Sequence, residues 1–180
     1  MSKNTHTPTV DDMRKDARKH IEKGAVTADY EADRTALIKQ LNHALATELV
    51  CVLRYRRHYF MARGIHSRLV AAEFLAHGNE ELAHVDSLAT RIVQLGGEPD
   101  FSPQKLDERS HAEYVAGNSL QDMIREDLVA ERIAIQSYRA IINSIGDKDS
   151  TTRDLLTRIL AVEEQHADEF AGLLDGLPSK

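Results

Sequence analysis

The sequence has little of what marks several classes of protein. Its single cysteine, Cys51, excludes an internal disulfide framework and a CxxC zinc or redox site. No apolar run reaches the ~18 residues that a membrane-spanning helix needs, and the first residues lack the apolar core of a secretory signal. We therefore expect a cytoplasmic protein with no membrane partner.

Positive charge is also scarce. The 180 residues carry 29 acidic side chains against 23 Lys and Arg, which gives a formal net charge of −6. Because phosphate contacts need clustered Lys and Arg, we do not expect a general nucleic-acid binder. The chain has no tryptophan and four prolines, while 42% of its residues are hydrophobic, which favours a mostly helical protein with a substantial core.

Four long segments carry the 3.6-residue apolar period of amphipathic helices, over about 33–63, 66–95, 120–145 and 150–175. Short joints around Gly64 and Gly146 make the first two segments, and the last two, antiparallel neighbours. About 22 residues with two prolines separate the second segment from the third. The pattern predicts an all-α four-helix bundle of two antiparallel hairpins joined by one long crossover.

Residues 1–30 form a separate N-terminal extension, and 31–180 form the bundle domain. An apolar stripe precedes Gly24 and predicts one short amphipathic helix, with the residues Val10, Met13, Ala17 and Ile21. We expect this extra helix to pack on the outside of the bundle or on a neighbouring subunit. The extension has six basic and five acidic side chains, so a DNA-binding arm is the weaker interpretation.

Two Glu-x-x-His motifs lie on the second and fourth predicted helices, at Glu81 and His84 and at Glu163 and His166. A separation of three residues puts carboxylate and imidazole on one helix face, where both reach one metal ion. One such motif alone carries little weight, but the pattern is doubled.

A glutamate deep in each of the other two helices completes the repeat. Glu48 and Glu131 are each followed seven residues later by a tyrosine, Tyr55 and Tyr138. All these carboxylates should meet at mid-bundle, where four of them without cations would be very unfavourable. One Glu from each of two helices plus Glu-x-x-His from the other two is typical of di-iron and di-manganese carboxylate proteins.

By symmetry, Glu81 and Glu163 would bridge two metal ions. Glu48 and His84 would complete one ion, and Glu131 and His166 the other. We expect Tyr55 near the site as a redox or hydrogen-bonding group, with a plain core tyrosine as the alternative. Asp127, one turn before Glu131, either holds a ligand histidine by its other ring nitrogen or is a solvated acid.

Other polar residues have simpler expectations. Cys51 is expected in the core. The remaining histidines lack partners at ligand spacing and are expected at the surface: His43, His58, His66, His77 and His111. His77 is alternatively a contact for entering iron, and Glu80 either binds incoming Fe(II) or is a solvated helix acid. Three arginines are expected in a solvated or subunit-interface patch: Arg54, Arg56 and Arg57.

The sequence resembles the bacterioferritins, helix by helix, from Leu41 to about Leu174. The resemblance lies in the segments LNHALATELVCVLRY, NEELAHVDSLATRIVQLGGEPD, REDLVAERIAI and ILAVEEQHADEF. It implies a ferritin-like fold and a ferroxidase that oxidises Fe(II) with O₂ or H₂O₂ at two iron ions per subunit, with manganese as the alternative metal. It implies the same six ligands and a hollow homo-oligomeric shell that stores ferric mineral.

Two departures from the bacterioferritins matter. Leu82 stands where they place the methionine that ligates haem, so we expect no haem bound in that way. Only 14 residues follow His166, so the short fifth helix of 24-subunit shells is expected to be missing. A shell of 12 subunits is favoured over one of 24.

Three other functions remain open. The same ligands would suit a di-iron or di-manganese peroxidase or catalase that stores no mineral. A Dps-like DNA-protecting shell, with residues 1–23 as arms, is a further alternative. A metal-free structural bundle fits least, because it leaves four buried glutamates without cations.

Overall fold

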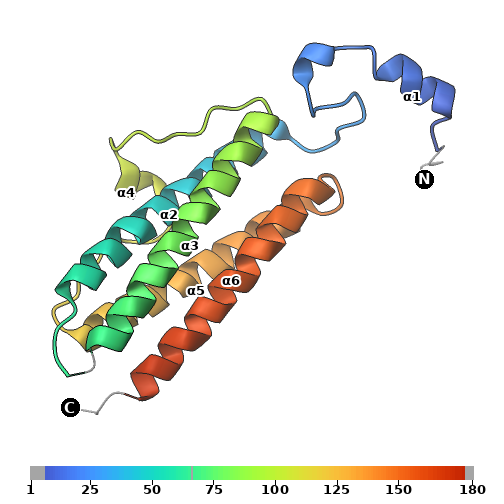
Figure 1. Cartoon of the computed structure of the whole chain (residues 1–180). Coiled ribbons are helices and arrows are strands. Elements are labelled where there is room, and N and C mark those ends of the chain that lie inside the picture. Colours follow the sequence, from blue (N-terminus) through green and yellow to red (C-terminus); the bar gives the residue numbers. More distant parts are fainter. Residues whose placement is uncertain (1–6, 66, 177–180) are drawn as a thin grey trace.

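The structure, a computed structural model, describes residues 7–65 and 67–176. Four long helices make up the bundle: α2 (Arg34–Met61), α3 (Ser67–Gln94), α5 (Leu120–Ile145) and α6 (Ser150–Asp175) (Figure 1). Three short elements accompany them: α1 (Val10–Asp16), the 3₁₀ turn η1 (Ile21–Lys23) and α4 (Leu106–Arg109). Within the described residues all regular structure is helical, as predicted.

The helices pair as two hairpins, α2 with α3 and α5 with α6. The chain between α3 and α5 travels along the bundle and carries α4 on the way (Figure 1). The hairpins also meet each other, α2 against α5 and α3 against α6. This is the predicted topology of two hairpins joined by a long crossover. None of the described helices has the length and apolar character to cross a membrane.

Side-chain caps explain where the helices begin. Asp33 accepts the amide of Ala36 at the start of α2, and Ser119 accepts that of Asp122 at the start of α5. Gly146, with a φ of +56°, ends α5, since a residue with a side chain is strained there.

Asp149 ties the end of the extension to the bundle. It caps α6 by accepting the amide of Thr152 at 2.9 Å, and its Oδ2 accepts the hydroxyl of Tyr30 at 2.6 Å. Arg91 of α3 donates to both of its carboxylate oxygens, at 3.0 and 2.9 Å. Three elements are therefore joined through one buried carboxylate.

The core consists of two apolar clusters on either side of a polar layer. One cluster contains Leu41, Leu88, Ile141 and Leu156, and the other contains Tyr55, Phe74, Ile124 and Phe170. Each long helix contributes to both clusters and carries a buried glutamate between its two contributions: Glu48, Glu81, Glu131 and Glu163. The apolar packing thus holds four acids at one level of the bundle.

The prediction of one N-terminal helix through Ile21 is wrong. α1 ends at Asp16, and Ile21 belongs to the separate turn η1, because His20 takes a left-handed conformation with a φ of +54°. The segment extends beyond the end of the bundle (Figure 1), with Val10, Met13 and Ile21 at least half exposed. Packing on the outside of its own bundle is therefore not observed for α1, and packing on a neighbouring subunit stays a prediction.

Two further expectations touch residues outside the described part. His66, predicted to lie at the surface, is outside the described residues. Residues 177–180, which bear on the predicted absence of a fifth helix, are outside them as well. The missing fifth helix therefore stays a prediction, as does the division of the chain at residue 30.

Candidate metal centre

Six side chains from the four long helices meet at mid-bundle. We refer to them as the six-residue cluster: Glu48, Glu81, His84, Glu131, Glu163 and His166. The four glutamates and His166 are 1% exposed, and His84 is 8% exposed. The sequence predicted all six to converge, and the structure places them together.

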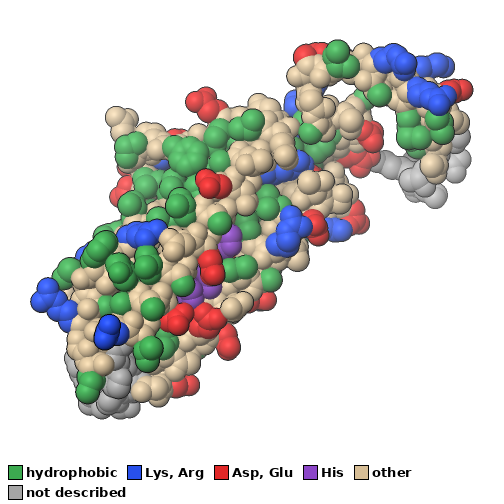
Figure 2. All heavy atoms as spheres, in the orientation of Figure 1, with side chains coloured by type: hydrophobic (Ala, Val, Ile, Leu, Met, Phe, Trp, Pro, Cys, Tyr) green, Lys and Arg blue, Asp and Glu red, His purple; other side chains and the backbone are tan. Residues whose placement is uncertain are grey.

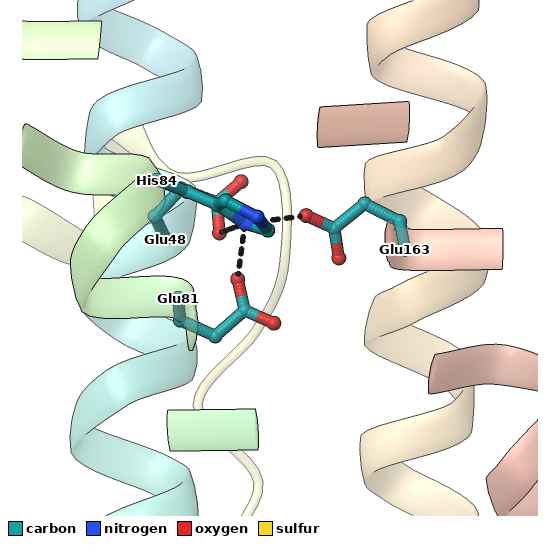
Figure 3. A group of neighbouring side chains, drawn as sticks. All are labelled: Glu48, Glu81, His84 and Glu163. Carbon is teal, nitrogen blue, oxygen red and sulfur yellow. Dashed lines mark hydrogen bonds and ion pairs between the residues drawn. The ribbon is translucent and has the colours of Figure 1, made fainter. Parts of the chain in front are cut away.

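The cluster consists of two overlapping groups. The first contains Glu48, Glu81, His84 and Glu163, and the second contains Glu81, Glu131, Glu163 and His166. In each group one ligand atom per residue lies within 4.8 Å of all the others. Figure 3 shows the first group, in which Glu163 approaches His84 from the side opposite Glu48 and Glu81. Glu81 and Glu163 belong to both groups, which is the arrangement expected of bridging carboxylates.

Distances within the groups suit ligands of a shared metal ion. His84 Nδ1 lies 3.0 Å from Glu163 Oε1, 3.3 Å from Glu81 Oε2 and 3.7 Å from Glu48 Oε2. One ring N–H cannot serve three carboxylates. Donors about 2.1 Å from one metal ion are about 3.0 Å apart at a right angle and about 3.4 Å apart at the tetrahedral angle.

The second group repeats this spacing. His166 Nδ1 lies 3.2 Å from Glu81 Oε1, 3.8 Å from Glu131 Oε2 and 3.9 Å from Glu163 Oε2. Three buried atoms form no hydrogen bond of good geometry with any of the described residues: His166 Nδ1, Glu81 Oε1 and Glu163 Oε1. Leaving such an atom unpaired costs about 1–3 kcal/mol, so these three atoms fit metal ligands. The donor set is able to hold metal.

Burial and mutual repulsion divide the four glutamates into two kinds. Burial raises the pKa of Glu48 to about 8, and the neighbouring Glu81 carboxylate adds to the shift. Burial and the other three carboxylates raise the pKa of Glu163 well above its usual range. Burial acts in the same direction on Glu81 and Glu131, but hydrogen bonds outweigh it, so that both pKa values fall below their usual range.

The two histidines are pulled toward the charged form. Burial alone would lower the pKa of His84, but its interactions with Glu48 and Glu81 raise it to about 10. His166 follows the same reasoning with Glu131 and Glu81, and its pKa rises to about 11. Without metal, the cluster at neutral pH therefore holds protons where a metal ion would otherwise lie.

Two tyrosines cross-link the ligands of opposite helices. The Tyr55 hydroxyl of α2 donates to Glu131 of α5, and the Tyr138 hydroxyl of α5 donates to Glu48 of α2. The structure therefore places Tyr55 at the site, hydrogen-bonded to a candidate ligand. Tyr138 was not predicted as a site residue, although the repeated seven-residue spacing from glutamate to tyrosine was the signal that could have found it.

Both expectations for Asp127 are wrong. It is fully buried and contacts no histidine of the cluster; its carboxylate accepts Arg54 Nε at 2.8 Å and lies 2.8 Å from His58 Nδ1. Arg54 and His58 are consequently buried, not at the surface. Arg54 also donates to the carbonyl of Glu113, and His58 Nε2 lies 3.0 Å from the carbonyl of Ala116. These residues fasten the crossover, which covers them.

The role expected of Asp127 falls to Glu80. Its Oε2 lies 2.5 Å from Nε2 of His166, the ring nitrogen that faces away from the cluster, and so fixes the orientation of that ring. His77, expected at the surface, is 2% exposed and stacks on His166 with ring centroids 3.9 Å apart. His111 is exposed as expected, and Cys51 is buried in the core as expected.

Known proteins share this fold and this region of sequence. The family model of the ferritin-like domain matches residues 38–179. The bacterioferritin of Brucella melitensis is 30% identical over 145 residues, covering 77% of this chain and 83% of its own. A nutrient stress-induced DNA-binding protein of Nostoc is 32% identical over 139 residues, covering 74% of each chain.

A solved structure is similar over most of the chain. It is the bacterioferritin-related protein of Bacteroides fragilis, a dodecameric thioferritin, with 32% sequence identity and a TM-score of 0.77. The match covers 80% of this chain and 87% of that one.

Proposed function

This chain belongs to the ferritin-like family, with bacterioferritins among its relatives, and on that premise we propose that it is an iron-storage ferroxidase. Two Fe(II) ions would be its substrates, each giving one electron to the oxidant and leaving as Fe(III) for storage inside a protein shell. With two protons, the two electrons would reduce O₂ to H₂O₂, or H₂O₂ to two molecules of water. The observation that carries the proposal is the pair of buried groups that share Glu81 and Glu163.

The residues of the cluster would have distinct tasks. Glu81 and Glu163 would bridge the two ions, with Glu48 and His84 completing one and Glu131 and His166 the other. Glu80 would orient His166, and the Tyr55 and Tyr138 hydroxyls would hold Glu131 and Glu48 in place. Because Glu81 and Glu163 belong to both groups, the two shared carboxylates would hold the ions next to each other, and their negative charge would offset that of the ions.

The test is an anaerobic titration of the metal-free protein with Fe(II), followed by O₂, with near-UV ferric-oxo absorbance as the readout. We expect a fast phase that saturates at about two Fe(II) per chain, then slower growth with excess iron. Glu131→Gln should lose the fast phase, whereas Glu126→Gln, one turn and a residue earlier on α5 and outside the cluster, should keep it. A fast phase retained in Glu131→Gln would remove that residue from the site.

The same experiment separates the alternatives. A fast phase without further uptake would indicate a di-metal peroxidase, and no fast phase with iron would direct attention to manganese and a catalase assay. DNA protection is a second candidate because the Nostoc relative is named as a DNA-binding protein. A salt-sensitive gel shift would support it, whereas the nearly balanced charge of residues 1–30 favours no shift.

We propose a cytoplasmic shell of twelve subunits, supported by the dodecameric relative from Bacteroides fragilis. At 20.2 kDa per chain, twelve subunits have a mass of about 240 kDa and 24 subunits about 485 kDa. Light scattering after size-exclusion chromatography distinguishes the two, and the larger mass would overturn the smaller shell.

A further inference from the structure

A third group of potential ligands lies beside the six-residue cluster, and we call it the outer triad: Glu73, His77 and Glu169. Glu73 and His77 precede Glu81 on α3 by two turns and by one, and Glu169 follows His166 on α6 by one turn. The Glu73 side chain is 46% exposed and that of Glu169 is 39% exposed, while His77 is 2% exposed. On the face formed by α3 and α6, histidine atoms reach the surface among acidic side chains (Figure 2).

The buried imidazole presents one nitrogen to the two carboxylates. His77 Nε2 lies 2.8 Å from Glu169 Oε2 and 4.0 Å from Glu73 Oε2. Its other nitrogen, Nδ1, is buried and has no hydrogen-bond partner within 7–65 and 67–176, so the polar contacts of the ring in this part of the chain are made by Nε2. Tyr55 and Phe170 pack edge-on against the ring and hold it in this orientation.

A proton on His77 Nε2 accounts for only part of this geometry. At 2.8 Å it would bond to Glu169, but Glu73 at 4.0 Å is beyond a hydrogen bond. The two distances bracket the separation of about 3.0–3.4 Å between donors of one metal ion. They also bracket the range of 3.0–3.9 Å found within the six-residue cluster.

Charge agrees with this geometry. The pKa of Glu169 lies below its usual range because Gln165 donates to Oε1 at 2.8 Å, with His77 adding to the effect. As metal ligands, the two carboxylates would contribute a charge of −2 and the imidazole none, which matches a divalent cation.

We infer that Glu73, His77 and Glu169 form a third site for a divalent transition metal such as Fe(II), Mn(II), Co(II) or Zn(II). One imidazole and two carboxylates leave coordination positions for water, and the exposure of both carboxylates lets the ion exchange with solvent. The site differs from the six-residue cluster in sharing no residue with it.

Its position gives the site a use, which rests on the proposed function. The His77 ring stacks on His166 at 3.9 Å, and Nδ1 of His166 faces Glu81, Glu131 and Glu163. Glu80, half exposed, lies against the other nitrogen of His166. A metal ion held by the outer triad is therefore one imidazole away from the buried cluster, which makes the triad a loading site between solvent and the ferroxidase ligands.

Cobalt stoichiometry tests the site itself. Metal-free protein is dialysed against Co(II), and bound metal per chain is measured for wild type and for the double variant Glu73→Gln/Glu169→Gln. Both substituted side chains are half exposed, so the fold is retained, which native mass and circular dichroism check. The matched control is Glu108→Gln/Glu164→Gln, which removes two exposed charges outside both sites.

We expect the double variant to bind one Co(II) fewer per chain than wild type and the control to bind the same number. Equal binding by all three proteins would overturn the site and leave His77 and Glu169 as an ion pair. The difference of one ion is independent of what the six-residue cluster binds. If that cluster bound none, the counts would be one and zero, and the proposed function would fail while the outer site stood.

Iron oxidation then tests the loading role. With low Fe(II), we expect the double variant to oxidise iron severalfold more slowly than the control. With saturating Fe(II), both should reach the same rate, because the ligands of the six-residue cluster are unchanged. An identical dependence on Fe(II) concentration in the two proteins would overturn the loading role and leave a metal site off the path.

Discussion

Metal binding to the six-residue cluster should release about four protons per pair of ions at pH 6. Without metal, Glu48 (pKa about 8), His84 (about 10) and His166 (about 11) hold protons at that pH. Burial also raises the pKa of Glu163 well above its usual range, which supplies the fourth proton. All four must leave before the carboxylates and imidazoles can act as ligands.

Charge balance explains why the exchange is tolerated in so closed a site. The metal-free cluster has two carboxylates and two imidazolium groups, and the filled cluster has four carboxylates and two divalent ions. Both states are neutral, so filling the site buries no net charge. The sign of the pH effect follows: raised pKa values mean that protons compete at low pH and binding tightens as the pH rises.

The magnitude is measurable by calorimetry. Four protons shared by two ions make the affinity for each ion rise about a hundredfold per pH unit near pH 6. Co(II) titrations in buffers of different ionisation enthalpy count the protons directly, and Glu73→Gln/Glu169→Gln removes any contribution of the outer triad. Release of one proton or none would refute the reasoning, since it would mean that carboxylates are ionised and imidazoles neutral in the metal-free core.

Three further outcomes are expected. Tyr55→Phe removes one of the hydrogen bonds that lower the pKa of Glu131, so that protons compete better with the metal at low pH. In equilibrium dialysis, Co(II) affinity should fall about tenfold at pH 5.5 and less at pH 8. An equal loss at both pH values would contradict the role of that hydroxyl. Asp127→Asn leaves Arg54 buried without its anion and should lower the free energy of unfolding by about 3–5 kcal/mol in urea titrations. A change below 1 kcal/mol would show that Arg54 finds another partner. Burial alone would raise the pKa of Asp149, but its hydrogen bonds lower the pKa from 3.8 to about 2. These hydrogen bonds therefore contribute about 2 kcal/mol to the free energy of unfolding above pH 4, and this contribution is lost as the pH falls toward 2. In thermal unfolding, Asp149→Asn should abolish this part of the acid dependence.

The bundle and its six-residue cluster could be predicted because the information is local. Each helix carries its own apolar period and ends near glycine, and each Glu-x-x-His pair lies within one turn. Glu48 and Glu131 follow from the repeat once the two motifs are recognised. The spacing of these residues along the chain therefore suffices to predict the members of the cluster without knowledge of how the helices pack.

The errors concern residues whose environment is made by distant parts of the chain. Asp127, Arg54 and His58 look like ordinary polar helix residues until the crossover closes over them, and nothing in the sequence of the crossover indicates that it does so. His77 and Glu169 are 92 residues apart, so only the contact between α3 and α6 brings them together. Sequence periodicity reports which face of a helix is apolar, but it does not report what lies on that face.

The crossover between α3 and α5 divides the ligands of the site evenly. Glu48, Glu81 and His84 precede it, and Glu131, Glu163 and His166 follow it. A chain cut in the exposed part of the crossover, near residues 102–105, would yield two fragments that each carry half of the site. Neither half holds a complete group of ligands, because both groups draw on Glu81 and Glu163. Binding of two metal ions by a mixture of the fragments would then indicate that the two fragments had reassembled.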